Sequence, residues 1–415
     1  MFQLGGVITT VINFLIWLAL RRRLKLAFPK RGKLYGIIAG VVMLILLHPA
    51  LAMAIGSWGG LRFVRELLPE WAQILTSGAQ FAAWTYGVLH LVIVGPVWVR
   101  NLIRKLRSKE DAKPVNEDRR KLLARAGLAL PAAAIVIAGA GVAGYHAAPV
   151  VTRLRLPVRR DMTNLHGLTI AQVTDVHIGS YMDRERLTEF QSAMNALNAD
   201  IHVITGDLID NRMWQLELAN FFIGGLKPRR GPVYLCMGNH EYIAGRDGSV
   251  QRVITELQEN NGRMLLDEVE DIRVGSDRLY MSGIDYMGRG ENRLTTHESL
   301  KLVTSEMKDD GAPRIVLAHH PRNFYEGREF PIDLMLSGHT HGGQINFGRI
   351  GDIALTPILP VDFYHNGYYE HRSTASQQAK VRRLYVNAGA GGWLPIRLNC
   401  PPEITLIELV PSETA

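Results

Sequence analysis

Long apolar runs separated by clusters of basic residues dominate the first 150 positions of the chain. Each run approaches the roughly 20 residues that a helix needs to cross the hydrocarbon core of a membrane. The pattern therefore predicts a bundle of about four transmembrane helices, over residues 4–20, 34–57, 72–99 and 127–148. The first run lacks a small-residue cleavage site, so we interpret it as a retained span rather than a signal peptide.

From Leu168 onward, short apolar runs alternate with segments of helical periodicity. Runs at 168–174 and 201–205 flank an amphipathic stretch at 183–198, which is the pattern of two parallel strands joined by a crossover helix. Further runs lie at 232–237, 279–284, 314–318 and 333–337, and alternating segments at 384–387 and 403–409 are expected to add strands to a second sheet. The pattern predicts an α/β fold in which helices flank a two-sheet sandwich.

The distribution of charge also changes near residue 150, where the long apolar runs end. Residues 1–150 carry 19 Lys and Arg against 6 Asp and Glu, whereas residues 151–415 carry 28 against 33. The formal net charge of +8 therefore arises in the apolar half, and no broad basic face is expected on the globular half. This distribution argues against nucleic acid as a partner. We predict two domains, a transmembrane helical region at 1–150 and a globular domain at 151–415.

The basic residues also predict an orientation in the membrane. They crowd the connections after the first and third apolar runs, and the positive-inside rule places those connections in the cytoplasm. Both termini, and with them the globular domain, are then extracytoplasmic on a multi-pass cell-membrane protein. The pair Arg119-Arg120 before an Ala-rich run also resembles a twin-arginine export signal, without its usual aromatic residue. Either interpretation exports the domain.

Only two cysteines occur, Cys236 and Cys400, so a disulfide framework is excluded and at most one bridge is possible. Cys236 lies within the apolar run 233–237 and is expected to be a core residue, because free cysteine is among the most buried residue types. Neither cysteine belongs to a metal-ligand pattern.

Metal-binding residue types follow the predicted strands of the globular domain. They occur in Asp175-x-His177, Gly206-Asp207, Gly238-Asn239-His240-Glu241, His319 and Gly338-His339-Thr340-His341. Because active sites of such sheets gather at the carboxyl ends of the strands, we expect these donors to converge at one edge. Mixed imidazole and oxygen donors suit Mn, Fe or Zn better than a metal selected by thiolates.

The order of these motifs resembles the calcineurin-like metallophosphoesterase superfamily over about residues 165–410. Residues 342–345 and 397–403 are similar to its bacterial branch, which is often carried on membrane segments. The resemblance implies two divalent metal ions and a bridging carboxylate, Asp207. It implies one metal site formed by Asp175, His177, Asp207 and His341, and another formed by Asp207, Asn239, His319 and His339. It also implies that His240 is the catalytic proton donor to the leaving oxygen.

Several neighbouring residues admit two interpretations. Glu241 either orients His240 or lies behind the ligands, and Asp210 either accepts a hydrogen bond from a ligating imidazole or caps a helix. The resemblance places the ligand at His319 and leaves the adjacent His320 facing a neighbouring loop. His202 is expected to pack on a strand.

The predicted function is a membrane-anchored phosphoesterase that hydrolyses phosphomonoester, phosphodiester or pyrophosphate bonds with a metal-activated hydroxide. The expected partners are the bilayer and a phosphorylated small molecule or lipid, such as a cell-envelope phosphate. The alternative is a membrane sensor or scaffold whose metal domain binds a phosphorylated ligand, although a pure binder has no need of a proton donor. A transporter is disfavoured, because the predicted spans contain no Asp, Glu, Lys or Arg.

Overall fold

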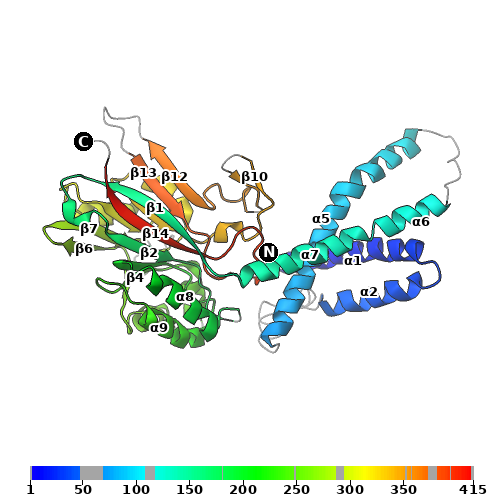
Figure 1. The fold of residues 1–415 in the computed structure, drawn as a ribbon, viewed down its shortest axis with the longest axis horizontal. Coiled ribbons are helices and arrows are strands. Elements are labelled where there is room, and N and C mark those ends of the chain that lie inside the picture. Colours follow the sequence, from blue (N-terminus) through cyan, green and yellow to red (C-terminus); the bar gives the residue numbers. More distant parts are fainter. Residues whose placement is uncertain are drawn as a thin grey trace. The chain divides into compact units, whose positions relative to one another are not determined.

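The computed structural model describes residues 2–46, 69–107, 117–179, 181–246, 249–286, 294–350, 353–356, 358–372, 381–392 and 394–412. Contacts between residues divide the chain into two compact units, Met1–Ala143 and Gly144–Ala415. The first unit is helical, and the second contains every strand of the described chain (Figure 1).

The described helices of the first unit are α1 (Phe2–Ala27), α2 (Gly32–Leu46), α5 (Glu70–Arg107), α6 (Glu117–Ala126) and α7 (Ala129–Tyr145). Within the described residues, two helical segments are long and apolar enough to cross a membrane, Trp71–Pro96 and Ala124–Tyr145. They overlap the third and fourth predicted spans. The first predicted span lies in α1, where no such segment is found among the fully described residues 11–27, and residues 47–57 of the second lie outside the described chain. The structure thus supports two candidate spans rather than four.

Polar side chains link helices inside the first unit. The amides of Asn13 in α1 and Gln80 in α5 bond reciprocally, with Asn13 Nδ2 donating to Gln80 Oε1 at 3.5 Å and Gln80 Nε2 donating to Asn13 Oδ1 at 3.3 Å. Ile16, Tyr86 and Ala134 form a small buried cluster beside them. The reciprocal amide pair thus joins α1 to α5 within this unit.

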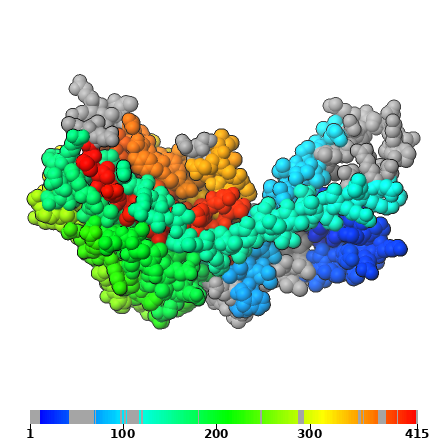
Figure 2. Space-filling model, in the orientation of Figure 1, coloured from blue at the N-terminus to red at the C-terminus, as the bar shows by residue number. Residues whose placement is uncertain are grey.

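The first sheet of the second unit has six strands. Their order is β1 (Val150–Val158), β14 (Glu403–Pro411), β2 (Thr169–Val173), β3 (Ile201–Thr205), β4 (Val233–Cys236) and β5 (Gly262–Met264). Strands β2 to β5 are parallel, and β14 pairs antiparallel with β2. The edge strand β1 runs parallel to β14, and the two lie side by side at the surface (Figure 2).

The second sheet also has six strands. Their order is β12 (Gly367–Arg372), β13 (Val381–Val386), β9 (Leu334–Ser337), β8 (Arg314–Leu317), β7 (Asp277–Gly283) and β6 (Glu268–Val274). A separate hairpin joins β10 (Arg349–Ile350) to β11 (Ile353–Ala354). The segment at 384–387 lies in this second sheet as predicted. The prediction was wrong for 403–409, because β14 belongs to the first sheet; alternation shows that a strand is half-buried but does not select its neighbour.

Opposite faces of each central strand enter different cores. Ile170 and Val203 point between the sheets, where they meet Leu317 of β8 and Leu336 of β9. The next residues along, such as Ile204, face the helices α8 (Arg184–Ala196), α9 (Leu216–Gly225), α10 (Asn239–Gly245) and α11 (Val250–Leu257). Helices α12 (Thr296–Glu306) and α13 (Phe324–Gly327) contribute to the core on the outer face of the second sheet. The predicted two-sheet α/β sandwich is confirmed.

Local sequence explains several helix starts. The Asp183 side chain accepts a hydrogen bond from the Arg186 backbone N–H and caps α8, and Thr295 with Glu298 forms a reciprocal capping box at α12. The described residues also contain four short 3₁₀ turns, η1 (Thr163–Leu165), η2 (Met213–Gln215), η3 (Pro321–Asn323) and η4 (His341–Gly343). The last of these carries one of the predicted metal ligands.

Candidate metal centre

All seven predicted ligands follow parallel strands at their carboxyl ends. Asp175 and His177 follow β2, Asp207 follows β3, Asn239 follows β4, His319 follows β8, and His339 and His341 follow β9. The two sheets are joined beneath these loops, because Gln172 Nε2 in the first sheet donates to the Ser337 carbonyl in the second at 3.2 Å. The strand ends of both sheets therefore supply one site.

Three of the seven residues form a first cluster. His177 Nε2 lies 3.1 Å from His341 Nε2, and Asp175 Oδ1 lies 3.4 Å from the same His341 nitrogen. The three side chains are buried and present their ligand atoms to one another. Burial and the nearby charge of His177 hold the pKa of His341 well below its usual value, which keeps the ring in the neutral form that binds metals.

A second cluster contains Asp207, His319 and His339. His319 Nε2 lies 3.1 Å from Asp207 Oδ2 and 3.2 Å from His339 Nδ1. The other ring nitrogen, His319 Nδ1, donates to the Thr205 carbonyl at 2.8 Å, which fixes the ring orientation and leaves Nε2 to face the cluster.

Asp207 stands between the two clusters. Its Oδ1 accepts a hydrogen bond from the His240 backbone N–H at 2.9 Å. Its Oδ2 faces both groups, 3.7 Å from His177 Nε2 and 3.1 Å from His319 Nε2. One carboxylate oxygen is thus used to hold the loop, and the other is in position to be shared by two cations.

Asn239 supplies a separate test of whether these residues fit a metal ion. Its Oδ1 is buried and has no hydrogen-bond partner among the described residues. A buried acceptor without a partner costs free energy, so native structures rarely keep one. An amide oxygen, a carboxylate and two imidazoles together are a donor set for a borderline or hard divalent cation. The residues present therefore fit the two metal ions.

The backbone is strained at five of the seven positions. The residues concerned have φ between 49° and 70°, and they are Asp175, His177, Asp207, His339 and His341. Left-handed backbone is uncommon for residues with a Cβ, and it costs free energy that the surrounding fold must supply. Such strain concentrates at functional sites, where sharp turns aim side chains inward.

Two glycines permit the loops to approach the ligands. A Cβ at Gly238 would lie 2.2 Å from Asp207 Oδ1, and a Cβ at Gly338 would lie 2.1 Å from Asp175 Oδ2. Neither position has room for any side chain. Glycine is therefore required in both the Gly-Asn-His and the Gly-His motif, because an aspartate carboxylate lies directly against the Cα of each.

Asp210 contacts two imidazoles rather than capping a helix. Its Oδ1 lies 3.3 Å from His177 Nδ1 and 3.3 Å from His240 Nδ1. Burial lowers the pKa of His240, but the carboxylates of Asp207 and Asp210 outweigh it and raise the pKa to about 10. Asp210 therefore orients His177 toward the first cluster and holds His240 beside it.

Of the two interpretations of Glu241, the structure supports the one in which it lies behind the ligands and not the one in which it orients His240. Its carboxylate accepts four backbone N–H groups, from Asp207 at 3.0 Å, Leu208 at 2.8 Å, Ile209 at 3.2 Å and Gly238 at 2.8 Å. The side chain is buried and ties the loop after β3 to the loop after β4. It positions Asp207 through the backbone.

The structure separates the adjacent histidines as expected. His320 Nδ1 accepts a hydrogen bond from the Arg322 backbone N–H at 3.2 Å, and its ring packs on His339 with centroids 4.2 Å apart. Sequence reasoning missed Tyr286, whose ring centroid lies 5.9 Å from that of His319 and 6.2 Å from that of His339. Its place just after β7, at the carboxyl end of a parallel strand, was the available signal.

Arg397 stands first in the 397–403 motif, but its role was not predicted from the sequence. Its side chain is 1% exposed, and its guanidinium donates to the carbonyls of Ala388 at 2.8 Å and Gly389 at 3.0 Å. The loop it holds reaches the first cluster, because the Gly391 N–H donates to the Asp175 carbonyl at 2.8 Å. The partners of Arg397 are backbone carbonyls, which carry no side-chain signature, so the 397–403 motif alone did not reveal this role.

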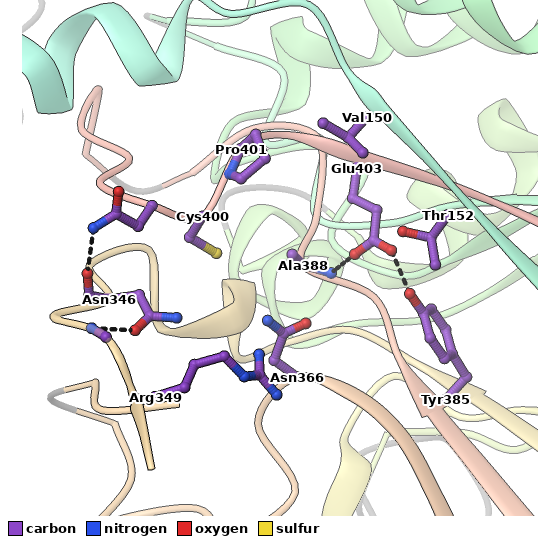
Figure 3. A pocket seen from close by; sticks show the side chains of 12 residues that line it. Val150, Thr152, Asn346, Arg349, Asn366, Tyr385, Ala388, Cys400, Pro401 and Glu403 are labelled. Carbon is purple, nitrogen blue, oxygen red and sulfur yellow. Dashed lines mark hydrogen bonds between the residues drawn. The ribbon is translucent and has the colours of Figure 1, made fainter. Parts of the chain in front are cut away.

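A cavity of about 360 Å³ lies beside the centre, and none of the seven ligands lines it. Arg349, Asn366 and Cys400 point into it (Figure 3). Cys400 Sγ lies 3.5 Å from the His341 carbonyl oxygen, so the η4 turn lies between the cavity and the other predicted ligands. Both cysteines are free and buried, and Cys236 lies in the core between the sheets as predicted.

Comparison with known proteins agrees with this geometry. The family model for calcineurin-like phosphoesterases matches residues 168–343. The chain is 31% identical over 254 residues to the metallophosphoesterase YkuE of Bacillus subtilis, a match that covers 59% of this chain and 79% of that protein. The chain belongs to the metallophosphoesterase family. It is a metal-dependent phosphoesterase, and calcineurin-like phosphoesterases use two divalent metal ions.

Two further relatives of this metallophosphoesterase extend the comparison. A transmembrane protein with a metallophosphoesterase domain from Danio rerio is 29% identical over 371 residues, covering 86% of this chain and 78% of that protein. The UDP-2,3-diacylglucosamine pyrophosphatase LpxG of Chlamydia trachomatis is 26% identical over 294 residues, covering 62% of this chain and 88% of that protein. The first similarity extends beyond the region that the family model matches.

Proposed function

We propose that this metallophosphoesterase is a membrane-anchored hydrolase with a binuclear metal centre. In this proposal Asp207 bridges two divalent ions. The first ion is bound by Asp175, His177, Asp207 and His341, and the second by Asp207, Asn239, His319 and His339. The observation that carries the proposal is the position of Asp207 Oδ2, which faces His177 Nε2 in one cluster and His319 Nε2 in the other.

The two ions would stabilise charge on the phosphate and lower the pKa of the attacking water. His240 donates a proton to the leaving oxygen. In support of this role, its Nδ1 is held by Asp210, which leaves Nε2 available to a substrate, and its side chain is partly exposed beside the ligands. Asp210 and Glu241 act as positioning residues. Asp210 contacts the rings of His177 and His240, and Glu241 holds the backbone of the loop that carries Asp207.

We propose a phosphorylated lipid or another cell-envelope phosphate as the substrate, cleaved at a phosphodiester or pyrophosphate bond. The name of the LpxG relative, a pyrophosphatase acting on a diacylated nucleotide sugar, supports this class. The two candidate spans support it as well, because they would hold the centre close to a bilayer.

The proposed topology is multi-pass, with the catalytic unit outside the cytoplasm. The segment between the two candidate spans supports this orientation, because residues 97–123 contain nine Lys and Arg against four Asp and Glu. A basic connection of this length remains in the cytoplasm, so the polypeptide that leaves the second span is outside.

The test is hydrolysis by the purified full-length chain in detergent, with Mn²⁺ added, of p-nitrophenyl phosphate and bis-p-nitrophenyl phosphate. Asp207→Ala is expected to lower kcat at least 10³-fold and to reduce bound metal below two ions per chain. Asp309→Ala, at a fully exposed carboxylate, is the matched control. Equal turnover by wild-type protein and the Asp207 variant would refute the proposed centre.

A further inference from the structure

Exposed apolar side chains are concentrated in one segment of the catalytic unit. Among its described residues, nine large hydrophobic side chains are exposed, and five of them lie between positions 347 and 368. They are Phe347, Ile350, Val361, Phe363 and Tyr368. Phe347 is 63% exposed and Ile350 is 69% exposed, at the β10–β11 hairpin. A soluble surface rarely gathers apolar residues in this way without a partner.

The hairpin is fixed to the catalytic unit next to Arg397. The Asn346 N–H donates to the Leu398 carbonyl at 2.9 Å, and Asn399 Nδ2 donates to the Asn346 carbonyl at 3.0 Å. Within the hairpin, Phe347 N–H donates to the Leu355 carbonyl at 2.8 Å. In the space-filling view the amber part of the chain lies against a red part near the C-terminus (Figure 2).

The same segment touches the end of the second candidate span. A Cβ at Gly144 would lie 2.1 Å from the Arg397 carbonyl oxygen, so the two backbones are in contact. Tyr145, the last residue of that span, is buried in the catalytic unit, and Arg186 Nη2 donates to its carbonyl at 3.2 Å. A chain of direct contacts thus joins the end of the span to the hairpin through residues 397–399.

We infer that the β10–β11 hairpin, with Phe347 and Ile350, rests in the boundary between headgroups and acyl chains of the bilayer that α7 crosses. This inference rests on the membrane anchor in the proposed function. Continuity with the end of α7 places the hairpin at the membrane surface, and apolar side chains beside a basic one, Arg349, are the composition of an interfacial segment. The partner is therefore a lipid surface rather than a protein.

The test measures the depth of single labelled cysteines in the full-length chain, reconstituted in phosphatidylethanolamine and phosphatidylglycerol vesicles. Both native cysteines are buried, so an introduced cysteine can be labelled selectively with an environment-sensitive fluorophore. The probe positions are Phe347→Cys and Ile350→Cys. Val136→Cys, exposed on α7, reports insertion of the span. Arg273→Cys is the distal control, because β6 lies at the opposite side of the catalytic unit from β10 (Figure 1).

The inference predicts that lipid-attached spin labels quench positions 347 and 350 at least threefold more than position 273, and that aqueous iodide does the reverse. If position 136 is in lipid while 347 and 350 are quenched by iodide, the inference is overturned and the anchor stands. If 347 and 350 are shielded from both quenchers, a protein partner or second copy covers them, and the inference also fails. An aqueous position 136 overturns the anchor and the inference together.

A second readout separates the inference from catalysis. The double variant Phe347→Ser and Ile350→Ser should hydrolyse the soluble bis-p-nitrophenyl ester as wild type does. Because position 350 is now serine, the fluorophore is attached at Leu355→Cys in this variant to follow contact with lipid. Lipid quenching at 355 should then fall at least twofold relative to a Leu355→Cys chain with the native hairpin. Unchanged quenching would contradict a role for the two side chains in holding the hairpin at the bilayer.

Discussion

Glu241 shows how strongly the centre depends on a single carboxylate that binds no metal. Its two oxygens accept four backbone N–H groups, three of them from the loop that carries Asp207. Glu241→Gln replaces one acceptor oxygen with an NH₂ group that cannot accept. We expect a loss of about 2 kcal/mol or more in the free energy of unfolding, because buried N–H groups lose their acceptor. Urea unfolding and metal content per chain measure it.

Glu259→Gln, at an exposed side chain, is the matched control for that substitution and should leave both quantities unchanged. Equal stability and equal metal content in the two variants would show that the four amides find other acceptors.

His202 gives a pH dependence that is independent of the metal centre. It is fully buried on β3, neither ring nitrogen has a partner among the described residues, and burial lowers its pKa to about 4. The unfolded chain has a histidine pKa near 6.5, so it binds the proton first as pH falls. The contribution of His202 to the free energy of unfolding is therefore fully present above pH 6.5. It decreases by about 3 kcal/mol as the pH falls to 4.

His202→Leu should remove this part of the pH dependence between pH 7 and 4, whereas His297→Leu, at an exposed ring, should keep it. Urea unfolding at several pH values in detergent is the measurement. A His202→Leu chain that loses stability over this interval as steeply as wild type would contradict the assignment.

For individual residues, the sequence predicted the types and order of the candidate ligands but not their backbone conformations. Asp175 and His339 could be named as candidate ligands from their motifs, while their left-handed backbone could not. Nor could the partners of Glu241, because three of them are backbone groups of residues 32 to 34 positions away and carry no side-chain signature.

Among the elements, the turn after β4 is the most sensitive to a small change. A Cβ at Gly238 would lie 2.2 Å from Asp207 Oδ1 and 2.5 Å from the Asp207 nitrogen. Gly238→Ala must displace that carboxylate, and we expect at least a 100-fold loss in kcat because positioning errors near 1 Å have that effect. Steady-state hydrolysis of the bis ester, with circular dichroism to follow folding, measures the change.

Gly224→Ala in α9 is the control, because its nearest contact, Asn260 Cβ at 3.4 Å, is ordinary packing. It should retain activity and helical content. Wild-type turnover by Gly238→Ala would mean that Asp207 can shift without consequence, contrary to its proposed bridging role.

Most strands could be located from apolar runs, and β3 matches its predicted bounds of 201–205. The short strand β5 and the amphipathic strands β1, β6 and β12 were not predicted. The edge strand β6 has charged residues at four of its seven positions, and β12 at two of its six, which reduces the apolar signal along the chain. The placement of β14 in the first sheet depends on contacts with β1 and β2, far away in sequence.

For the whole molecule, orientation in the membrane is the prediction with the widest consequence. A reporter fused after Ala415 should be active outside the cytoplasm, because the basic segment between the two candidate spans resists translocation. A pair of reporters, alkaline phosphatase and green fluorescent protein, should give opposite signals. Fluorescence with no phosphatase activity would place the catalytic unit in the cytoplasm and refute the orientation.

The sequence by itself determined the class of fold and the kind of chemistry. These follow from properties that are local in the chain, namely apolar periodicity, charge and the order of donor residues. Only the tertiary structure decided that Asp207 Oδ2 faces two clusters, that Arg397 supports the Asp175 loop, and that exposed Phe347 and Ile350 are linked to the end of α7. Each of these depends on groups that sheet pairing and loop closure bring together. The residues lie far apart along the chain, so no local sequence pattern predicts their contact.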